Sequence, residues 1–236
     1  MDKIKTFIIS FNRLSFLEQQ VTELSKYSDL DLHIIDNGST YAPLLKYLDE
    51  VDCNITFMPQ NEGHEVVWEK GVSRFFCKDE PYIVTDNDIL PYTDNWLSLL
   101  IEGLEKYPEV NKVGLGLRID DLPVNIPFRD EIINHEQNNL FRQELNDIRF
   151  IKMPVDTTLA LYRAGYHDYS IWGTCSNSDD SECKSIRTMY PNMARHLSWY
   201  LRMQDLQTEE YKYYLEHLGQ GTGHWSGWQA QKLKRG

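Results

Sequence analysis

The stretch Tyr82-Ile83-Val84-Thr85-Asp86-Asn87-Asp88 decides the fold of this chain. It is a short apolar run that ends in two carboxylates one residue apart, and it predicts a buried strand. Residues i and i+2 of an extended chain point the same way, so Asp86 and Asp88 face one crevice. A divalent cation carrying substrate phosphates would offset the two like charges, because Mg²⁺ and Mn²⁺ prefer oxygen ligands. A solvated Asp-x-Asp turn is the alternative.

The sequence before this motif alternates strand and helix patterns. Helix patterns follow the first three strands, and the first has apolar positions three or four apart from Leu14 to Leu24. After the second strand, Ser39 or Thr40 could cap the next helix. This alternation predicts βαβ units and a mostly parallel sheet. The predicted strands cover residues 5–10, 31–36, 54–59 and 82–86.

Polar side chains follow each of these strands. Ligands of parallel sheets bind outside the carboxyl ends of the strands, so these side chains are predicted to converge on one binding edge. Asn61 and Gly63 are also predicted to open a helix, with helix capping as their alternative role. The converging residues are Asn12, Asp36, Asn61, Asp86 and Asp88.

On these residues the chain resembles the glycosyltransferases of the GT-A fold, and among them the large nucleotide-sugar-dependent family 2. The resemblance implies a single α/β domain of the GT-A type, with a mostly parallel, Rossmann-like sheet and flanking helices. Residues 1–115 would form the nucleotide-sugar-binding half, and residues 116–236 the acceptor-binding half. The second half is similar to bacterial and large-virus enzymes of glycan assembly at residues 117–123, 154–158 and 194–200.

The resemblance also implies a donor site for a UDP- or GDP-type sugar and a Mn²⁺ or Mg²⁺ ion. Asp36 would contact the nucleobase, although Asp-Asn-Gly is also good turn chemistry. Asp86 and Asp88 would bind the metal, and His196 would join the metal or diphosphate shell, with a core histidine as its alternative and His224 as a rival. The expected nucleotide contacts are Ser10, Asn12, Arg13, Asp36, Asn61, Gly63, Asp86, Asn87 and Arg195.

A carboxylate would act as the general base toward the acceptor hydroxyl. Asp156 is the first choice, because it follows an apolar flank and precedes a strand predicted at residues 157–162. Asp121 and Asp120 end another predicted strand and compete for the role. The chain lacks both the acceptor-region Glu-Asp pair and the Gln/Arg-x-x-Arg-Trp motif of the broader family, so these motifs do not identify the base. Inversion at the sugar is implied by the resemblance and not by the spacing of residues.

Composition is compatible with an enzyme of one domain. The chain has 236 residues, 41% of them hydrophobic, and a formal net charge of −12, which argues against nucleic acid as a partner. No apolar run approaches the ~20 residues that cross a bilayer, and no signal peptide is evident. We therefore expect a cytoplasmic protein with reduced cysteines. We also expect the chain to be part of a longer polypeptide. A polar loop at residues 173–184 could close over the donor and the acceptor.

The expected function is metal-dependent glycosyl transfer from a nucleotide-diphosphate sugar to a hydroxyl of a glycan or lipid-linked acceptor. Assembly of capsule, lipopolysaccharide or glycoprotein glycan is a plausible setting. A nucleotide- or carbohydrate-binding domain that lost catalysis is the alternative from another class. A nucleotidyltransferase ranks third, because residues 10–14 contain no glycine for a phosphate loop.

Overall fold

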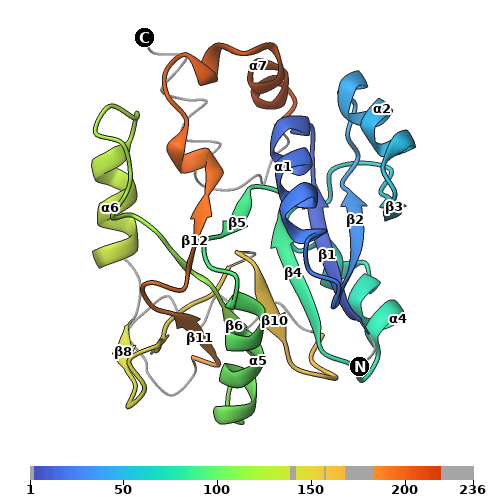
Figure 1. The fold of residues 1–236 in the computed structure, drawn as a ribbon. Coiled ribbons are helices and arrows are strands. Elements are labelled where there is room, and N and C mark those ends of the chain that lie inside the picture. The colour runs from blue at the N-terminus through green and yellow to red at the C-terminus, as the bar shows by residue number, and fades with distance from the viewer. Residues whose placement is uncertain (1–2, 139–141, 157, 168–182, 219–236) are drawn as a thin grey trace.

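A computed structural model describes residues 3–138, 142–156, 158–167 and 183–218. Within these residues a nine-stranded sheet has the order β3-β2-β1-β4-β10-β6-β11-β9-β8, and a smaller sheet has the order β5-β12-β7 (Figure 1). The strands are β1 (Ile4–Ser10), β2 (Leu30–Asp36), β3 (Asn54–Phe57), β4 (Tyr82–Asp86), β5 (Ile89–Pro91), β6 (Lys112–Gly114), β7 (Gly116–Leu117), β8 (Gln143–Glu144), β9 (Phe150–Lys152), β10 (Ala160–Tyr162), β11 (Ser185–Thr188) and β12 (Met193–His196).

Helices connect and cover these strands. The α-helices are α1 (Leu14–Leu24), α2 (Ala42–Glu50), α3 (Val66–Glu69), α4 (Val72–Cys77), α5 (Trp96–Lys106), α6 (Arg129–Asn138) and α7 (Glu209–Glu216), and the short 3₁₀ helices are η2 (Leu197–Tyr200) and η3 (Asp205–Gln207). Strands β1 to β4 are mutually parallel, whereas β10 and β9 run against their neighbours. The predicted α/β class with a mostly parallel sheet is confirmed.

Successive side chains of β1 point to opposite faces of the sheet, and both faces are covered by helices. Ile8 packs into the core cluster that contains residues of α1, α2 and α5. Phe7 and Ile9 point to the opposite face and join the cluster built on α3 and α4. Burial on both faces accounts for the continuous apolar run from Phe7 to Ile9 in this strand.

Three predicted boundaries were wrong. The strand predicted at residues 157–162 begins only at Ala160, and Leu159 before it has a positive φ of 54°, which interrupts extended backbone. The helix expected at Asn61 begins at Val66. The strand expected to end at Asp120 and Asp121 is β7, which ends at Leu117.

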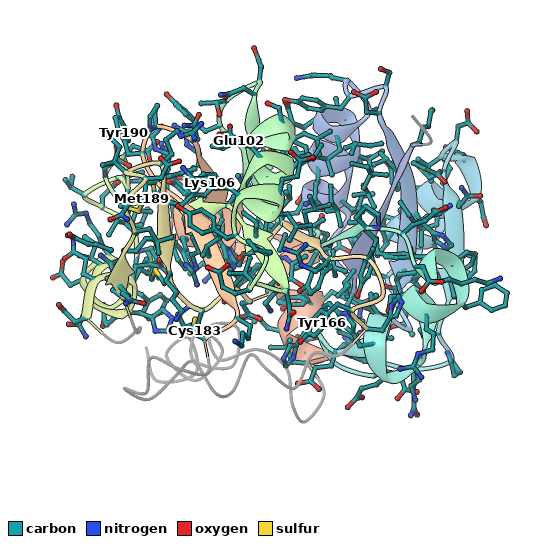
Figure 2. The ribbon with its side chains drawn as sticks, turned by 90° about the horizontal axis from the view of Figure 1, so that it is seen from below. Glu102, Lys106, Tyr166, Cys183, Met189 and Tyr190 are labelled. Carbon is teal, nitrogen blue, oxygen red and sulfur yellow. The ribbon has the colours of Figure 1, made fainter. Side chains whose placement is uncertain are left out.

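Ion pairs connect α5 to the segment before β9. Glu102 and Lys106 of α5, both labelled in Figure 2, contact Arg149 and Asp147 at 2.8 and 2.7 Å. The side chains of Glu102, Lys106 and Arg149 are 41–47% exposed, whereas that of Asp147 is 10% exposed, so we expect the Glu102–Arg149 pair to contribute little to stability.

Among the described residues, Cys53 and Cys77 are free thiols, as predicted. Cys175, His224 and most of the loop predicted at residues 173–184 lie outside the described residues. No helix in the described part of the chain combines the length and apolar character needed to span a bilayer.

Candidate functional site

Three neighbouring parallel strands bring their carboxyl ends together, as the sequence predicts. In the register of the sheet, Ser10 at the end of β1 lies beside Asp36 at the end of β2. On the other side of β1, Ile9 lies beside Asp86 at the end of β4. The strands β2 and β4 point upward in Figure 1, and α7 lies at this upper end. Acidic side chains from two strands therefore share one edge of the sheet.

The side chain of Gln20 fixes the turn that carries the two carboxylates. It is fully buried on α1, and its Nε2 donates to the carbonyl oxygens of Asp86 and Ile89 at 2.7 and 2.9 Å. The same nitrogen lies 3.0 Å from Oγ1 of Thr85. Sequence reasoning missed Gln20, although a polar residue within the apolar stripe from Leu17 to Leu24 is a usable signal.

Asn87, between the two carboxylates, turns toward β1. Its side chain is buried, and its Nδ2 lies 3.3 Å from both Oγ of Ser10 and the carbonyl oxygen of Arg13. The predicted nucleotide contacts Ser10 and Asn87 thus contact each other. Their role toward a nucleotide stays a prediction.

Asp88 lies in a buried polar cluster. Its Oδ2 accepts a short hydrogen bond from Oγ of Ser198, and it lies 3.3 Å from Nδ1 of His196 and 3.7 Å from Nη1 of Arg13. The Oδ1 atom is buried and has no hydrogen-bond partner among the described residues. Pairing of β12 with β5 produces this arrangement, because it sets His196 opposite Ile89, the neighbour of Asp88. The structure therefore brings the predicted residue His196 to the acidic motif.

Arg13 is held by aromatic rings as well as by Asp88. Only 5% of the residue is exposed, and its guanidinium lies 3.9 Å from the ring centre of Phe16 and 4.8 Å from that of Tyr214. Tyr211, also on α7, lies 5.5 Å from it. A buried cation next to a buried carboxylate offsets part of the cost of removing both from water. The helix α7 thus contributes to the surroundings of the site.

Asp36 is the second buried carboxylate of this edge. It is 2% exposed, its Oδ2 accepts from the backbone N–H of Ser39 at 3.1 Å, and its Oδ1 has no partner in the described part of the chain. Burial raises the pKa of Asp36, while hydrogen bonds from Ser39 and Gly38 oppose the rise. A buried carboxylate oxygen whose lone pairs accept no hydrogen bond from the described residues suits an N–H group of a ligand.

The loops beside Asp36 are held by Asn37, which sequence reasoning treated only as part of a turn. Its Nδ2 donates to Oδ1 of Asn61 and to the carbonyl oxygen of Gly63, and its Oδ1 accepts from the backbone of Glu62. Gly38 permits this closeness: it has a φ of 76°, and a Cβ there would lie 2.4 Å from the backbone of Gln60. The side chain of Asn61 therefore serves the loop, while Gly63 faces open space.

Asn12 holds the loop before α2. Its Oδ1 accepts from the backbone N–H groups of Thr40 and Tyr41 at 2.7 and 2.9 Å, and its own N–H donates to Oγ of Ser39. The predicted capping of α2 by Ser39 or Thr40 was wrong. The N-cap residue of α2 is Tyr41, and its side chain makes no capping hydrogen bond. Asn12 has a positive φ of 51° and is fully buried.

The predicted residues Asp120, Asp121 and Arg195 lie in one network of ion pairs. Arg118 donates to both carboxylate oxygens of Asp120 at 3.0 and 2.8 Å and lowers its pKa. Burial raises the pKa of Asp121, but the hydroxyl of Tyr200 and the guanidinium of Arg195 lower it more, so the net pKa is lowered. Arg195 thus contacts a carboxylate in this structure.

Asp156 lies in a second acidic region. It is half-buried and contributes, after burial and Glu69, to the raised pKa of Glu65. The ring of His64 lies 3.7 Å from the Glu65 carboxylate and lowers that pKa. Glu65 immediately precedes α3 and was not predicted as a site residue. A carboxylate with a raised pKa is a rival to Asp156 as a base.

The donor set at the β4 end fits a hard divalent cation. Asp86 and Asp88 provide carboxylates, and the buried Oδ1 of Asp88 has no other partner among the residues that the structure describes. Among the described residues, no group of three or more His, Cys, Asp or Glu side chains lies close enough together to bind a metal ion by itself. A metal held through one or two carboxylates and completed by substrate phosphates needs no such set.

A hollow of about 500 Å³ lies beside β3 and α4, with Met58, Phe75 and the Glu62–Lys70 ion pair on its walls. None of Asp36, Asp86 and Asp88 lines it. We locate the site by the carboxylates and not by this hollow, because its lining brings together no catalytic or nucleotide-binding chemistry.

Comparison with known proteins gives a family and a fold. The sequence model of the family described as "Glycosyl transferase family 2" matches residues 6–169. No curated protein sequence matches the chain. Among solved structures, the mannosyltransferase PcManGT from Pyrobaculum calidifontis, in complex with GDP-Man and Mn²⁺, superposes with a TM-score of 0.52 at 13% identity over 83% of this chain and 56% of that one. TarS from S. aureus, residues 1–349, matches with a TM-score of 0.46 at 11% identity over 83% and 60%. The chain thus spans less than two thirds of either structure.

Proposed function

The chain belongs to glycosyl transferase family 2, and we propose that it transfers a sugar from a nucleotide-diphosphate sugar to a hydroxyl group of a glycan or lipid-linked acceptor. The observation that carries the proposal is the pair of buried carboxylates, Asp36 at the end of β2 and Asp88 in the turn after β4, on either side of β1. Each has one oxygen without a partner in the described residues. Both oxygens lie at one edge of the sheet, where they can accept a donor group of a ligand or bind a cation.

The nucleotide is proposed to lie across the ends of β1, β2 and β4. Asp36 would accept a hydrogen bond from an N–H group of uracil or guanine. Arg13 would add positive charge close to Asp88, where the diphosphate is expected. The mannosyltransferase PcManGT, which has the same fold, is described with GDP-Man and Mn²⁺. This supports a nucleotide-diphosphate sugar as the donor class without fixing the base or the sugar.

Asp86 and Asp88 would hold a Mg²⁺ or Mn²⁺ ion, with His196 beside them. When bound, such an ion neutralises charge that develops on the departing diphosphate. The chain's own residues orient these ligands: Gln20 holds the backbone of the turn, and Ser198 holds Oδ2 of Asp88.

Asp156 is proposed as the general base that takes the proton of the acceptor hydroxyl in a single displacement with inversion. Asp120 and Asp121 are weaker candidates, because arginine partners occupy both and their pKa values are lowered. We propose residues 1–115 as the donor half and the rest as the acceptor half of the domain. Assembly of capsule, lipopolysaccharide or glycoprotein glycan is the proposed setting.

The proposal is tested by thermal unfolding with UDP-, GDP-, dTDP- and CMP-sugars, each with Mn²⁺ and with EDTA. A true donor stabilises the protein by about 2.7 kcal/mol at 100 times its Kd. The expected result is stabilisation by one nucleotide class only when Mn²⁺ is present, followed by release of that nucleoside diphosphate when an acceptor is added. Binding without turnover for every acceptor class would favour a non-catalytic nucleotide-binding domain.

A further inference from the structure

We infer that Ser198 is a positioning residue, which presents one oxygen of Asp88 and one nitrogen of His196 to the metal; the inference rests on the proposed function. Ser198 lies 110 residues from Asp88 in sequence and is 6% exposed. Its surroundings contain the predicted ligands Asp88 and His196. Three observations carry the inference.

The first observation is that every contact to the Asp88 carboxylate falls on the same oxygen. Ser198 Oγ, His196 Nδ1 and Arg13 Nη1 all approach Oδ2. Oδ1 receives no hydrogen bond from the described residues and is buried. The contact with Ser198 therefore engages one oxygen of the carboxylate and leaves the other available to a ligand.

The second observation is the proton inventory of the cluster. An ionised carboxylate only accepts hydrogen bonds, so the single hydroxyl proton of Ser198 must be donated to Asp88. Nδ1 of His196 lies 2.8 Å from the same hydroxyl oxygen, which has no proton left to give. Nδ1 must therefore carry a proton and donate it. In the neutral imidazole this leaves the lone pair on Nε2, the form that binds a metal.

The third observation is that the segment is fixed in place. The backbone N–H of Leu197 donates to the carbonyl oxygen of Asp88 at 2.7 Å, and the His196 ring stacks on Trp199 with ring centres 4.9 Å apart and planes 1° apart. With backbone and ring both restrained, the hydroxyl of Ser198 sets the orientation of the two polar groups. Groups that orient metal ligands in this way typically affect metal affinity by roughly 10–100-fold.

The test measures Mn²⁺ affinity by electron paramagnetic resonance of free Mn²⁺, with and without GDP or UDP, in Ser198→Ala and Ser198→Thr. We expect Ser198→Ala to weaken Mn²⁺ binding roughly 10–100-fold and Ser198→Thr, which keeps the hydroxyl, to stay close to the wild type. Ser185→Ala is the matched control, because this serine is also buried and donates to the carbonyl oxygen of Met153 at 2.8 Å, away from the site. It should lose stability without losing Mn²⁺ affinity.

A second measurement needs no variant that must fold. Nitrogen-15 NMR of the wild-type imidazoles, recorded well above the ordinary histidine pKa of about 6.5, should show the His196 proton on Nδ1. A proton on Nε2, or unchanged Mn²⁺ affinity in folded Ser198→Ala, would overturn the inference and leave the proposed function standing if the wild type still binds Mn²⁺. Failure of the wild type to bind Mn²⁺ with either nucleotide would overturn the metal claim of the proposed function and this inference together.

Discussion

The side-chain amide of Gln20 donates a hydrogen bond to the carbonyl oxygen of Asp86 at 2.7 Å. A residue of the first helix thereby holds the turn in which both carboxylates of the acidic motif lie. The contact joins chain positions that are 66 residues apart. Its consequence for the protein is measurable in both stability and activity.

Gln20→Leu should lower the free energy of unfolding by about 1–3 kcal/mol, because buried acceptors lose their donor. Turnover should also fall, since small displacements of catalytic groups are costly. Urea denaturation and initial rates provide the two measurements. The neighbouring exposed residue Gln19 supplies the control, and Gln19→Leu should change stability by no more than about 0.5 kcal/mol. Equal effects of the two variants would contradict the role of Gln20.

Asp88→Asn should reduce Mn²⁺-dependent turnover by at least about 100-fold, because a metal contributes several kcal/mol and each 1.36 kcal/mol is a factor of ten. EDTA should have the same effect on the wild type. Initial rates across a Mn²⁺ titration are the measurement. The exposed residue Asp94 serves as the charge-matched control through Asp94→Asn. Full activity of Asp88→Asn, or of the wild type in EDTA, would contradict the proposal that turnover needs a divalent metal bound by Asp88.

Asp36→Asn should weaken donor binding by about 1–3 kcal/mol, the range for a hydrogen bond to a charged group. Isothermal titration calorimetry with the donor nucleotide measures this change. An affinity equal to that of the wild type would remove Asp36 from the nucleobase contact.

The same variant should be more stable than the wild type near neutral pH. Burial raises the pKa of Asp36, so the folded state holds its proton more tightly than the unfolded state. The wild type therefore loses stability as the pH rises from about 3.9 through the raised folded-state pKa. Asn does not titrate and avoids that loss. Unfolding midpoints should differ at pH 7 and converge below pH 4; a wild type more stable at pH 7 would reverse the sign of this prediction.

Asp156→Asn should keep donor binding and Mn²⁺ affinity while reducing turnover by a factor on the order of 10²–10⁴, the usual contribution of a general base. Rates with saturating donor and acceptor provide the measurement. Asp121→Asn and Glu65→Gln are run in parallel. If Asp156→Asn is fully active and one of the other two is not, the role of the base moves to that residue.

Much of the first half of the fold was predictable, and the reason lies in local sequence. The apolar run at Ile8 and Ile9, the turn at Asn37-Gly38 and the strand ending at Asp86 each specify their own element. Parallel strands must then bring these ends to one edge, so Asp36, Asp86 and Asp88 could be grouped without a structure. The second half is built from strands of two to four residues, which are too short to show a hydrophobic period. There the strand predicted at residues 157–162 began too early, since β10 starts at Ala160.

The contacts that complete the site were not predictable in the same way. Gln20, Asn37 and Ser198 act through side-chain hydrogen bonds that reach residues 24 to 110 positions away. Such a bond leaves no periodic trace, because it depends on where two distant elements meet. His196 was found only through a family resemblance, and the network that orients it was not found at all.

The aromatic surroundings of Arg13 are completed late in translation, because they include residues of α7. The chain emerges from its amino end, so Arg13, Asp86 and Asp88 are made long before Ser198 and the tyrosines of α7. A nascent chain ending at residue 169, the limit of the family match, already has both carboxylates but none of these later groups. Until α7 arrives, the guanidinium of Arg13 lacks two of its three aromatic neighbours. Arg13 and α7 must therefore both be synthesised before aromatic side chains fully surround the pair of Arg13 and Asp88.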